Sequence, residues 1–142
     1  MSRRGLALAF VLVLILPLTA TGCSQSTTID GIVDHKVMSG IKDSTQYEIV
    51  FSSPDDDGTP VNFVTDDDLQ DCFLLHGELV VTEDIENQMR AVYSDFVYQV
   101  SVTKSPDDTF GYLTTREIFN KMSLGATVRC QVSGLRIVKI ID

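Results

Sequence analysis

The fold is decided by residues 98–132, which read YQVSVTKSPDDTFGYLTTREIFNKMSLGATVRCQV. At the start, Tyr98, Val100 and Val102 alternate with polar residues, which is the pattern of a half-buried strand. The SPDD sequence that follows favours a tight turn, because Pro fixes one backbone angle and Asp side chains accept from nearby N–H groups. A second strand, a helix that ends at Gly125 and a third strand complete the stretch.

The same order of patterns occurs once before. Ser-Pro-Asp-Asp stands at 53–56 and again at 105–108, an offset of 52 residues. A strand that begins with Tyr precedes each copy, and a helical pattern that ends at a glycine follows each one. We therefore predict an internal repeat of a β-β-α unit, over about residues 46–83 and 97–132.

These patterns predict a mainly β fold with two short helices. The expected strands lie at 30–38, 46–53, 60–65, 78–84, 95–104, 110–114, 126–132 and 135–141, and the expected helices lie at 66–75 and 115–123. Residues 84–94 fit either a loop or a helical turn. From Glu78 onward the order is three strands, a helix and two strands, which resembles the OB-type barrel. We expect an OB-like small barrel or a sandwich, built from the duplicated unit. The order of its elements also resembles that of small secreted envelope modules.

The first 25 residues, MSRRGLALAFVLVLILPLTATGCSQ, predict an export signal. Two arginines precede an apolar segment, residues 6–18, that is too short for a confident membrane span. Ala-Thr-Gly-Cys at residues 20–23 resembles the lipobox of bacterial lipoproteins, with Ala20 where leucine is more usual. The resemblance implies cleavage after residue 22, a lipid on Cys23 and attachment to the extracytoplasmic face of the cell membrane.

Two alternatives to lipidation stay open. Cys23 fits an ordinary thiol after a conventional signal-peptide cleavage, and the apolar segment fits an uncleaved anchor. The export route is open as well, since Arg3 and Arg4 fit either the general secretory or the twin-arginine route. In the favoured interpretation, residues 1–22 are the signal, residues 23–29 are the lipidated N-terminus and linker, and residues 30–142 form a single β-rich domain.

The charge of the chain limits its partners. The 142 residues include 20 acidic and 11 basic side chains, for a net charge of −9. The predicted signal holds two of the basic residues and no acidic one, so the mature chain has a charge of −11. Such a surface repels phosphate groups, which disfavours binding of nucleic acids and of anionic lipid headgroups. The lipid, rather than the protein surface, would hold the domain at the membrane.

Two further cysteines are candidates for a disulfide. Cys72 lies on the apolar stripe of the first predicted helix, and Cys130 lies on the inward face of a predicted strand. Both can reach one core, and an exported domain is in a compartment that permits disulfides. The alternative is a pair of buried apolar thiols.

Acidic residues at the predicted turns are candidates for a calcium site. They are Asp55, Asp56, Asp57, Asp107 and Asp108. Ca²⁺ prefers six to eight oxygen ligands, but consecutive Asp side chains point apart and no EF-hand spacing is present. Turn chemistry and a solvated acidic surface are the favoured interpretation, and we predict no other cofactor.

The sequence contains no HExxH, GxSxG or CxxC motif. His35 is interpreted as a boundary residue on a strand, and His76 as a cap at the end of the first predicted helix. Tyr93 and Tyr112 are candidates for exposed aromatic rings on a barrel face, whereas Tyr98 is expected in the core. We therefore expect a non-enzymatic binding or envelope-maintenance role with a protein or cell-wall partner. A Ca²⁺-stabilised adhesion or accessory module and a hydrolase with an unrecognised site are the alternatives.

Overall fold

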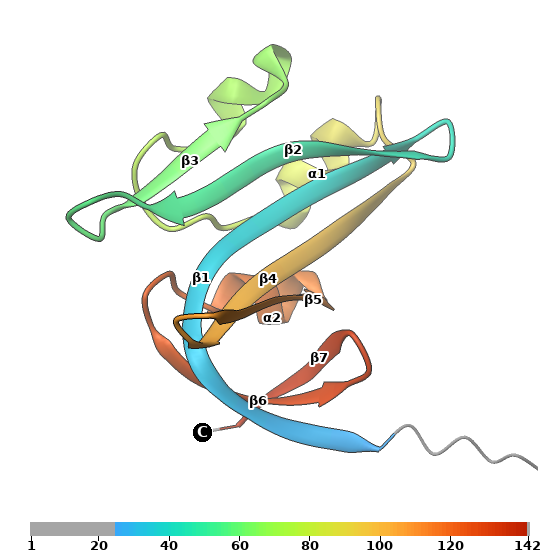
Figure 1. Ribbon diagram of the computed structural model, residues 1–142. Helices are drawn as coiled ribbons and strands as arrows, with labels where there is room; N and C mark the ends of the chain where they lie inside the picture. The colour runs from blue at the N-terminus through green and yellow to red at the C-terminus, as the bar shows by residue number, and fades with distance from the viewer. Residues whose placement is uncertain (1–24, 142) are drawn as a thin grey trace, which may run out of the picture.

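The computed structural model describes residues 25–141, so the predicted signal, the lipobox and Cys23 lie outside the described residues. The elements, in chain order, are β1 (Ser26–Lys42), β2 (Thr45–Pro54), β3 (Pro60–Val64), the 3-10 helix η1 (Asp67–Cys72), α1 (Glu83–Met89), β4 (Asp95–Ser105), β5 (Asp108–Thr114), α2 (Arg116–Lys121), β6 (Thr127–Ser133) and β7 (Arg136–Ile141). Figure 1 shows a barrel at one end and an extension of β2, β3 and η1 at the other. Within the described range, no helix is long and apolar enough to cross a membrane.

Five of the strands close into a barrel. The sheet has the order β3-β2-β1-β4-β5-β7-β6, and β1 also pairs with β6, which closes the ring β1-β4-β5-β7-β6. Neighbouring strands of this ring are antiparallel, except for β5 and β7, which are parallel. α2 lies between the third and fourth strands of the ring in chain order, as in an OB-type barrel. The predicted fold class is confirmed, with three short helices among the described residues instead of two.

The first strand of the barrel is β1, and the predicted strand at 78–84 is wrong. That segment buries Leu79 and Val81 but does not join the sheet. Side chains bond its main chain instead. The Lys36 ammonium donates to the Leu79 carbonyl at 2.9 Å, and the Asn120 amide donates to Val81 at 2.8 Å and accepts from it at 2.9 Å. Because these side chains satisfy its buried polar groups, the segment needs no partner strand.

A single long strand, β1, belongs to both the barrel and the extension. Its first part pairs with β6, and its second part lies between β4 and β2. Gly31 lies near the position where the partner changes from β6 to β4. A Cβ atom at Gly31 would lie 2.5 Å from Cγ1 of Val102 and 2.7 Å from the carbonyl oxygen of Thr103. The missing side chain therefore permits the close approach of β1 and β4.

The N-caps of η1 and α2 each follow a threonine that does not cap the helix. η1 is capped by Asp66 rather than Thr65, and α2 is capped by Thr115 rather than Thr114. The hydroxyl groups of Thr65 and Thr114 donate to strand carbonyls instead. The third helix, α1, lies in the segment that sequence patterns left open, and Thr82 caps it.

The internal repeat stays a prediction. β2, β3 and η1 have the same order as β4, β5 and α2, and the two hairpins lie on opposite edges of β1. Gly77 and Gly125 follow the two helices with φ of 120° and 74°. The likeness ends there, because β6 follows Gly125 whereas the segment after Gly77 is not a strand.

Replacement of Gly31 by alanine tests the contact between β1 and β4. The new methyl group would collide with backbone as well as with a side chain, so we expect the free energy of unfolding to fall by about 1–3 kcal/mol. Urea denaturation measures this change, and Thr28→Ala, at an exposed position of the same strand, is the control. Equal stability of the two variants would contradict the close approach.

Candidate functional site

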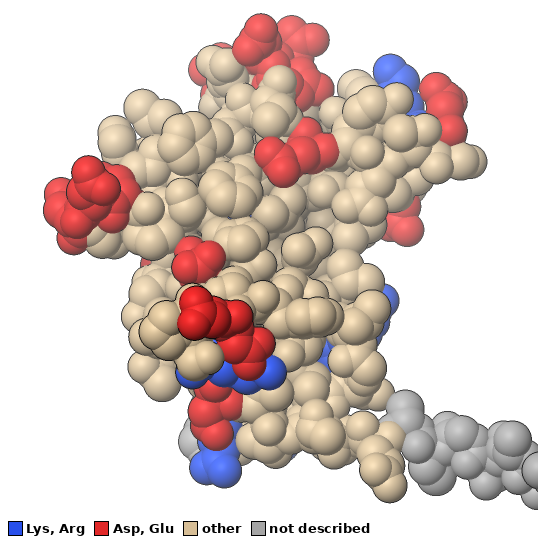
Figure 2. Space-filling view, viewed as in Figure 1, with Lys and Arg blue, Asp and Glu red and all other residues tan. Residues whose placement is uncertain are grey.

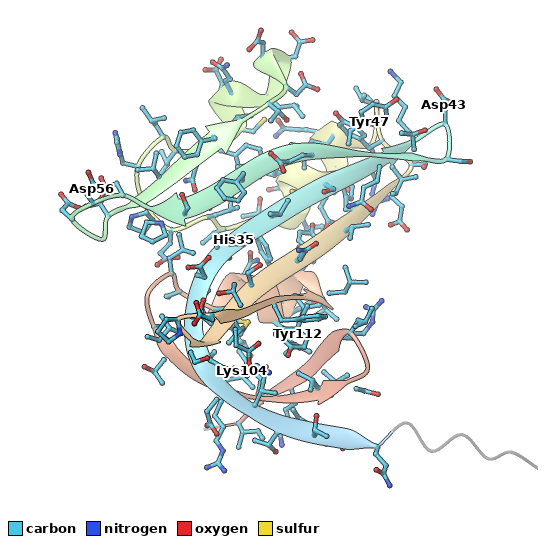
Figure 3. All side chains as sticks on the ribbon, viewed as in Figure 1. His35, Asp43, Tyr47, Asp56, Lys104 and Tyr112 are labelled. Carbon is cyan, nitrogen blue, oxygen red and sulfur yellow. The ribbon has the colours of Figure 1, made fainter. Side chains whose placement is uncertain are left out.

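Three aromatic side chains follow one another across β1, β2 and β3, on the face of the sheet away from the core. The ring centroids of His35 and Phe51 are 5.2 Å apart, and those of Phe51 and Phe63 are 6.3 Å apart. Phe51 and Phe63 are direct partners in the β2–β3 ladder, and Phe63 is 54% exposed. We call these three residues the aromatic row, and Figure 3 labels His35, where the row begins on β1.

At the Phe63 end of the row, a groove of about 420 Å³ opens between β3 and η1. We call it the extension groove, and it is lined by Asn62, Phe63, Val64, Gln70, Asp71, Phe73 and Leu75. Leu75 is 64% exposed, and its neighbour Leu74 is 74% exposed. Large apolar side chains that gather in solvent around a groove are typical of a binding surface.

Asn62 holds one wall of the extension groove in place. Its buried amide donates to the carbonyls of Leu74 at 2.6 Å and Gly77 at 3.1 Å, and it accepts from the Ser52 hydroxyl at 2.6 Å. Two main-chain hydrogen bonds tie the same segment, residues 74–77, to the edge of β3. The wall is thus formed in the absence of a ligand, which lowers the entropy cost of binding.

A chain of hydrogen bonds lies beside the aromatic row. A β-bulge at Asp34 brings its carboxylate 2.8 Å from Nδ1 of His35, although the two residues are adjacent in sequence. Nε2 of the same ring lies 2.8 Å from Oγ of Ser101 on β4. The carboxylate can only accept, so Nδ1 carries the hydrogen, and Nε2 of the neutral ring accepts from the hydroxyl.

This order of acid, imidazole and hydroxyl is the one used by serine hydrolases. Ser101 is only 2% exposed, however, and its strand pairs with neighbours on both sides. A substrate carbonyl must reach the serine oxygen and find N–H donors for its developing negative charge. The main chain around Ser101 instead pairs with β1 on one side and β5 on the other, so it offers no such donors. We infer that these bonds fix the orientation of the His35 ring on the outer face.

A fluorophosphonate probe tests that interpretation. We expect no labelling of the chain under conditions that label a serine hydrolase added to the same sample, because the buried hydroxyl is out of reach. Labelling that is lost in both Ser101→Ala and His35→Ala would instead establish a nucleophilic serine.

A second polar cluster lies where α1 meets the barrel. Glu86 of α1 accepts from Arg116 at 2.9 Å and from the Tyr98 hydroxyl, and Arg90 lies 3.7 Å away. Burial, together with the hydrogen bond to Glu86, raises the pKa of Tyr98 above its ordinary range. Two of these partners lie outside α1, Tyr98 on β4 and Arg116 on α2, so the Glu86 carboxylate fixes α1 to the barrel and the cluster has a structural role.

Lys36 is fully buried on the inner face of β1. Its ammonium group lies 4.4 Å from the centroid of the Phe119 ring and donates to the Leu79 carbonyl. Burial lowers the pKa of Lys36 from 10.5 to about 8, and the charge of Glu78 opposes this effect. The amine is shielded from solvent, so it contributes to the packing of α2 and the segment after Gly77 against β1 rather than to reaction with a ligand.

The lowered pKa of Lys36 makes the free energy of unfolding depend on pH. Between pH 8 and 10.5 the folded chain has lost the lysine proton that the unfolded chain still binds. Stability relative to Lys36→Met therefore rises with pH, by up to about 3 kcal/mol across this window, and is lowest below pH 8. Urea denaturation from pH 7 to pH 10 measures the difference.

The comparison with Lys36→Met cancels the titration of other groups, including Tyr98. Lys42→Met removes an exposed lysine from the same strand and is expected to keep the wild-type pH profile. Parallel profiles for wild type and Lys36→Met would contradict the lowered pKa.

Both candidate disulfide cysteines are free thiols in the structure. Cys72, at the end of η1, is partly exposed, and its sulfur lies 3.8 Å from the side-chain oxygen of Gln88. Cys130, on β6, is buried, and burial raises the pKa of its thiol. The bridge stays a prediction.

Asp55, Asp56 and Asp57 form the turn between β2 and β3, where Figure 3 labels Asp56 at the tip. Asp55 accepts from the main chain of Asp57 at 3.1 Å and of Thr59 at 2.9 Å. Hydrogen bonds from Thr59 lower the pKa of Asp57, and the largest effect comes from the Thr59 hydroxyl. These carboxylates thus stabilise the turn, as expected for such sequences.

Asp107 and Asp108 lie at the other hairpin, between β4 and β5, and Asp108 is 3.4 Å from the Lys104 ammonium. Over residues 25–141, no group of three or more His, Cys, Asp or Glu side chains is arranged to hold a metal ion. A calcium site stays a prediction.

The residues of the extension groove were not identified from sequence. Tyr93 and Tyr112, expected to be exposed, are both buried, and the exposed ring at the groove belongs to Phe63. The available signal was the apolar run at residues 73–75, because one amphipathic helix cannot bury three consecutive large side chains on a single face.

Searches against protein-family models, curated proteins and solved structures found no match for this chain.

Proposed function

We propose that this chain is a lipid-anchored protein of the cell envelope with a non-enzymatic binding role, and that it binds its partner through the extension groove. The observation that supports this proposal is a preformed groove whose lining includes the exposed apolar side chains of Phe63 and Leu75. Exposing these groups costs free energy in a lone domain, and a partner that covers them would recover it.

The anchor would be the lipid on Cys23, which the lipobox sequence supports. Cys23 precedes Ser26, the first residue of β1, by three positions. Three residues span at most about 10 Å, so the start of β1 would lie close to the membrane surface. The start of β1 is at the barrel end of the molecule (Figure 1), and the extension would face away from the bilayer.

Crosslinking in intact cells tests the proposed role. A photoreactive amino acid at position 75 is expected to yield a discrete protein adduct, because Leu75 lines the groove. The same amino acid at position 135 is the control, since Leu135 is 63% exposed, compared with 64% for Leu75, but lies on the barrel between β6 and β7. A fatty-acid analogue should label the wild type and not Cys23→Ala.

Two results would contradict the proposal. Equal adducts at positions 75 and 135, or none at either, would remove the groove from the binding role. Persistent fatty-acid label on Cys23→Ala would remove the anchor.

A further inference from the structure

We infer that the occupant of the extension groove is a basic polypeptide segment that also carries apolar side chains. The inference rests on the proposed binding role and adds the chemistry of the partner. The groove supplies the apolar contact, and the negative charge around it favours a positively charged partner.

The charges of the chain are divided unevenly between the two ends of the molecule. Residues 43–89 contain thirteen of the twenty acidic residues and none of the eleven lysines and arginines. This range forms β2, β3, η1 and α1. The part of β1 that pairs with β2 adds two lysines to the extension, the buried Lys36 and Lys42. In Figure 2, red side chains predominate on the extension, with blue beside red at the β1–β2 turn, whereas blue and red lie together on the barrel.

One acidic side chain lines the groove itself, and others lie on the elements that form it. η1 contributes Asp71 to the groove wall, and Asp67 and Asp68 form the first turn of the same helix. The β2–β3 turn, which precedes β3 in the same extension, contains Asp55, Asp56 and Asp57. A cationic chain would meet Asp71 in the groove, and the field of the acidic extension would speed its association.

Phe63 adds a second reason for a cation. Its ring is half exposed at the mouth of the groove, where a lysine or arginine can lie over the ring face. Such cation–π contacts favour arginine and lysine in partly desolvated sites. The apolar side chains of the same segment would cover Phe73 and Leu75.

A polypeptide fits these features better than the other envelope polymers. Anionic polymers and lipid headgroups would be repelled by the same carboxylates. A neutral glycan would not use the charge, and its rings would find only Phe63 as an exposed ring in the groove.

Selection from a random peptide library tests the partner chemistry. The full chain, held in discs of zwitterionic lipid, is the target, and the peptides are displayed on yeast. We expect the enriched peptides to combine lysine or arginine with large apolar residues. Their binding should fall at least about tenfold in Leu75→Ser and stay unchanged in Leu135→Ser. Asp71→Asn should weaken binding, and Asp107→Asn, at the barrel hairpin, should not.

A synthetic copy of the best peptide then separates charge from apolar contact. Replacing its basic residues by glutamate should weaken binding at least about tenfold, and added salt should weaken the parent peptide. Enriched peptides that are neutral or acidic yet need Leu75 would overturn this inference and leave the proposed function intact. The inference would also be overturned if the protein sedimented with purified cell-wall glycan and Leu75→Ser did not. Absence of the in-cell adduct at position 75 would contradict the proposed function and not the chemistry of the peptides that the groove selects.

Discussion

The strand β1 is the constraint on which the rest of the structure depends. It closes the barrel through β6, provides the edge for the β4–β5 hairpin and, over its second half, the edge for the β2–β3 hairpin. A strand in three pairings cannot shift its register by one residue without exposing its core face, so its pattern is strongly specified. The bulge at Asp34 and the missing side chain at Gly31 are the adjustments that let one strand belong to both the barrel and the extension.

Polar side chains complete the structure where strands are absent. Lys36 and Asn120 bond the main chain of the segment after Gly77, and Asn62 bonds the segment that carries Leu74. Each of these side chains is inside or at the margin of the core, where an unpaired main-chain group would cost free energy. They satisfy main-chain groups that a neighbouring strand would otherwise satisfy. For this reason residues 74–81 keep a defined path although they form no strand of the sheet.

The sequence predicted the barrel well, because alternating patterns such as Tyr98, Val100 and Val102 depend only on local periodicity. The two SPDD turns were placed correctly for the same reason. The strand at 78–84 was wrong because its apolar alternation reports burial and cannot show whether a strand or two side chains satisfy the backbone. The groove could not be predicted, since Phe63 and Leu75 meet only after β3 and η1 have folded against each other. The contact between His35 and Ser101 needs the register of two strands, which no local pattern contains.

The hydrogen bonds between residues 74–77 and β3 have a consequence for recognition. They occupy the main-chain groups of Pro60 and Asn62 at the outer edge of β3. Unprotected, such an edge would be open to pairing with any extended chain. An incoming segment therefore cannot be recognised there by main-chain pairing, which accepts almost any sequence. Discrimination between partners must come from side-chain shape and charge, so a change of a single residue on either surface can alter selectivity.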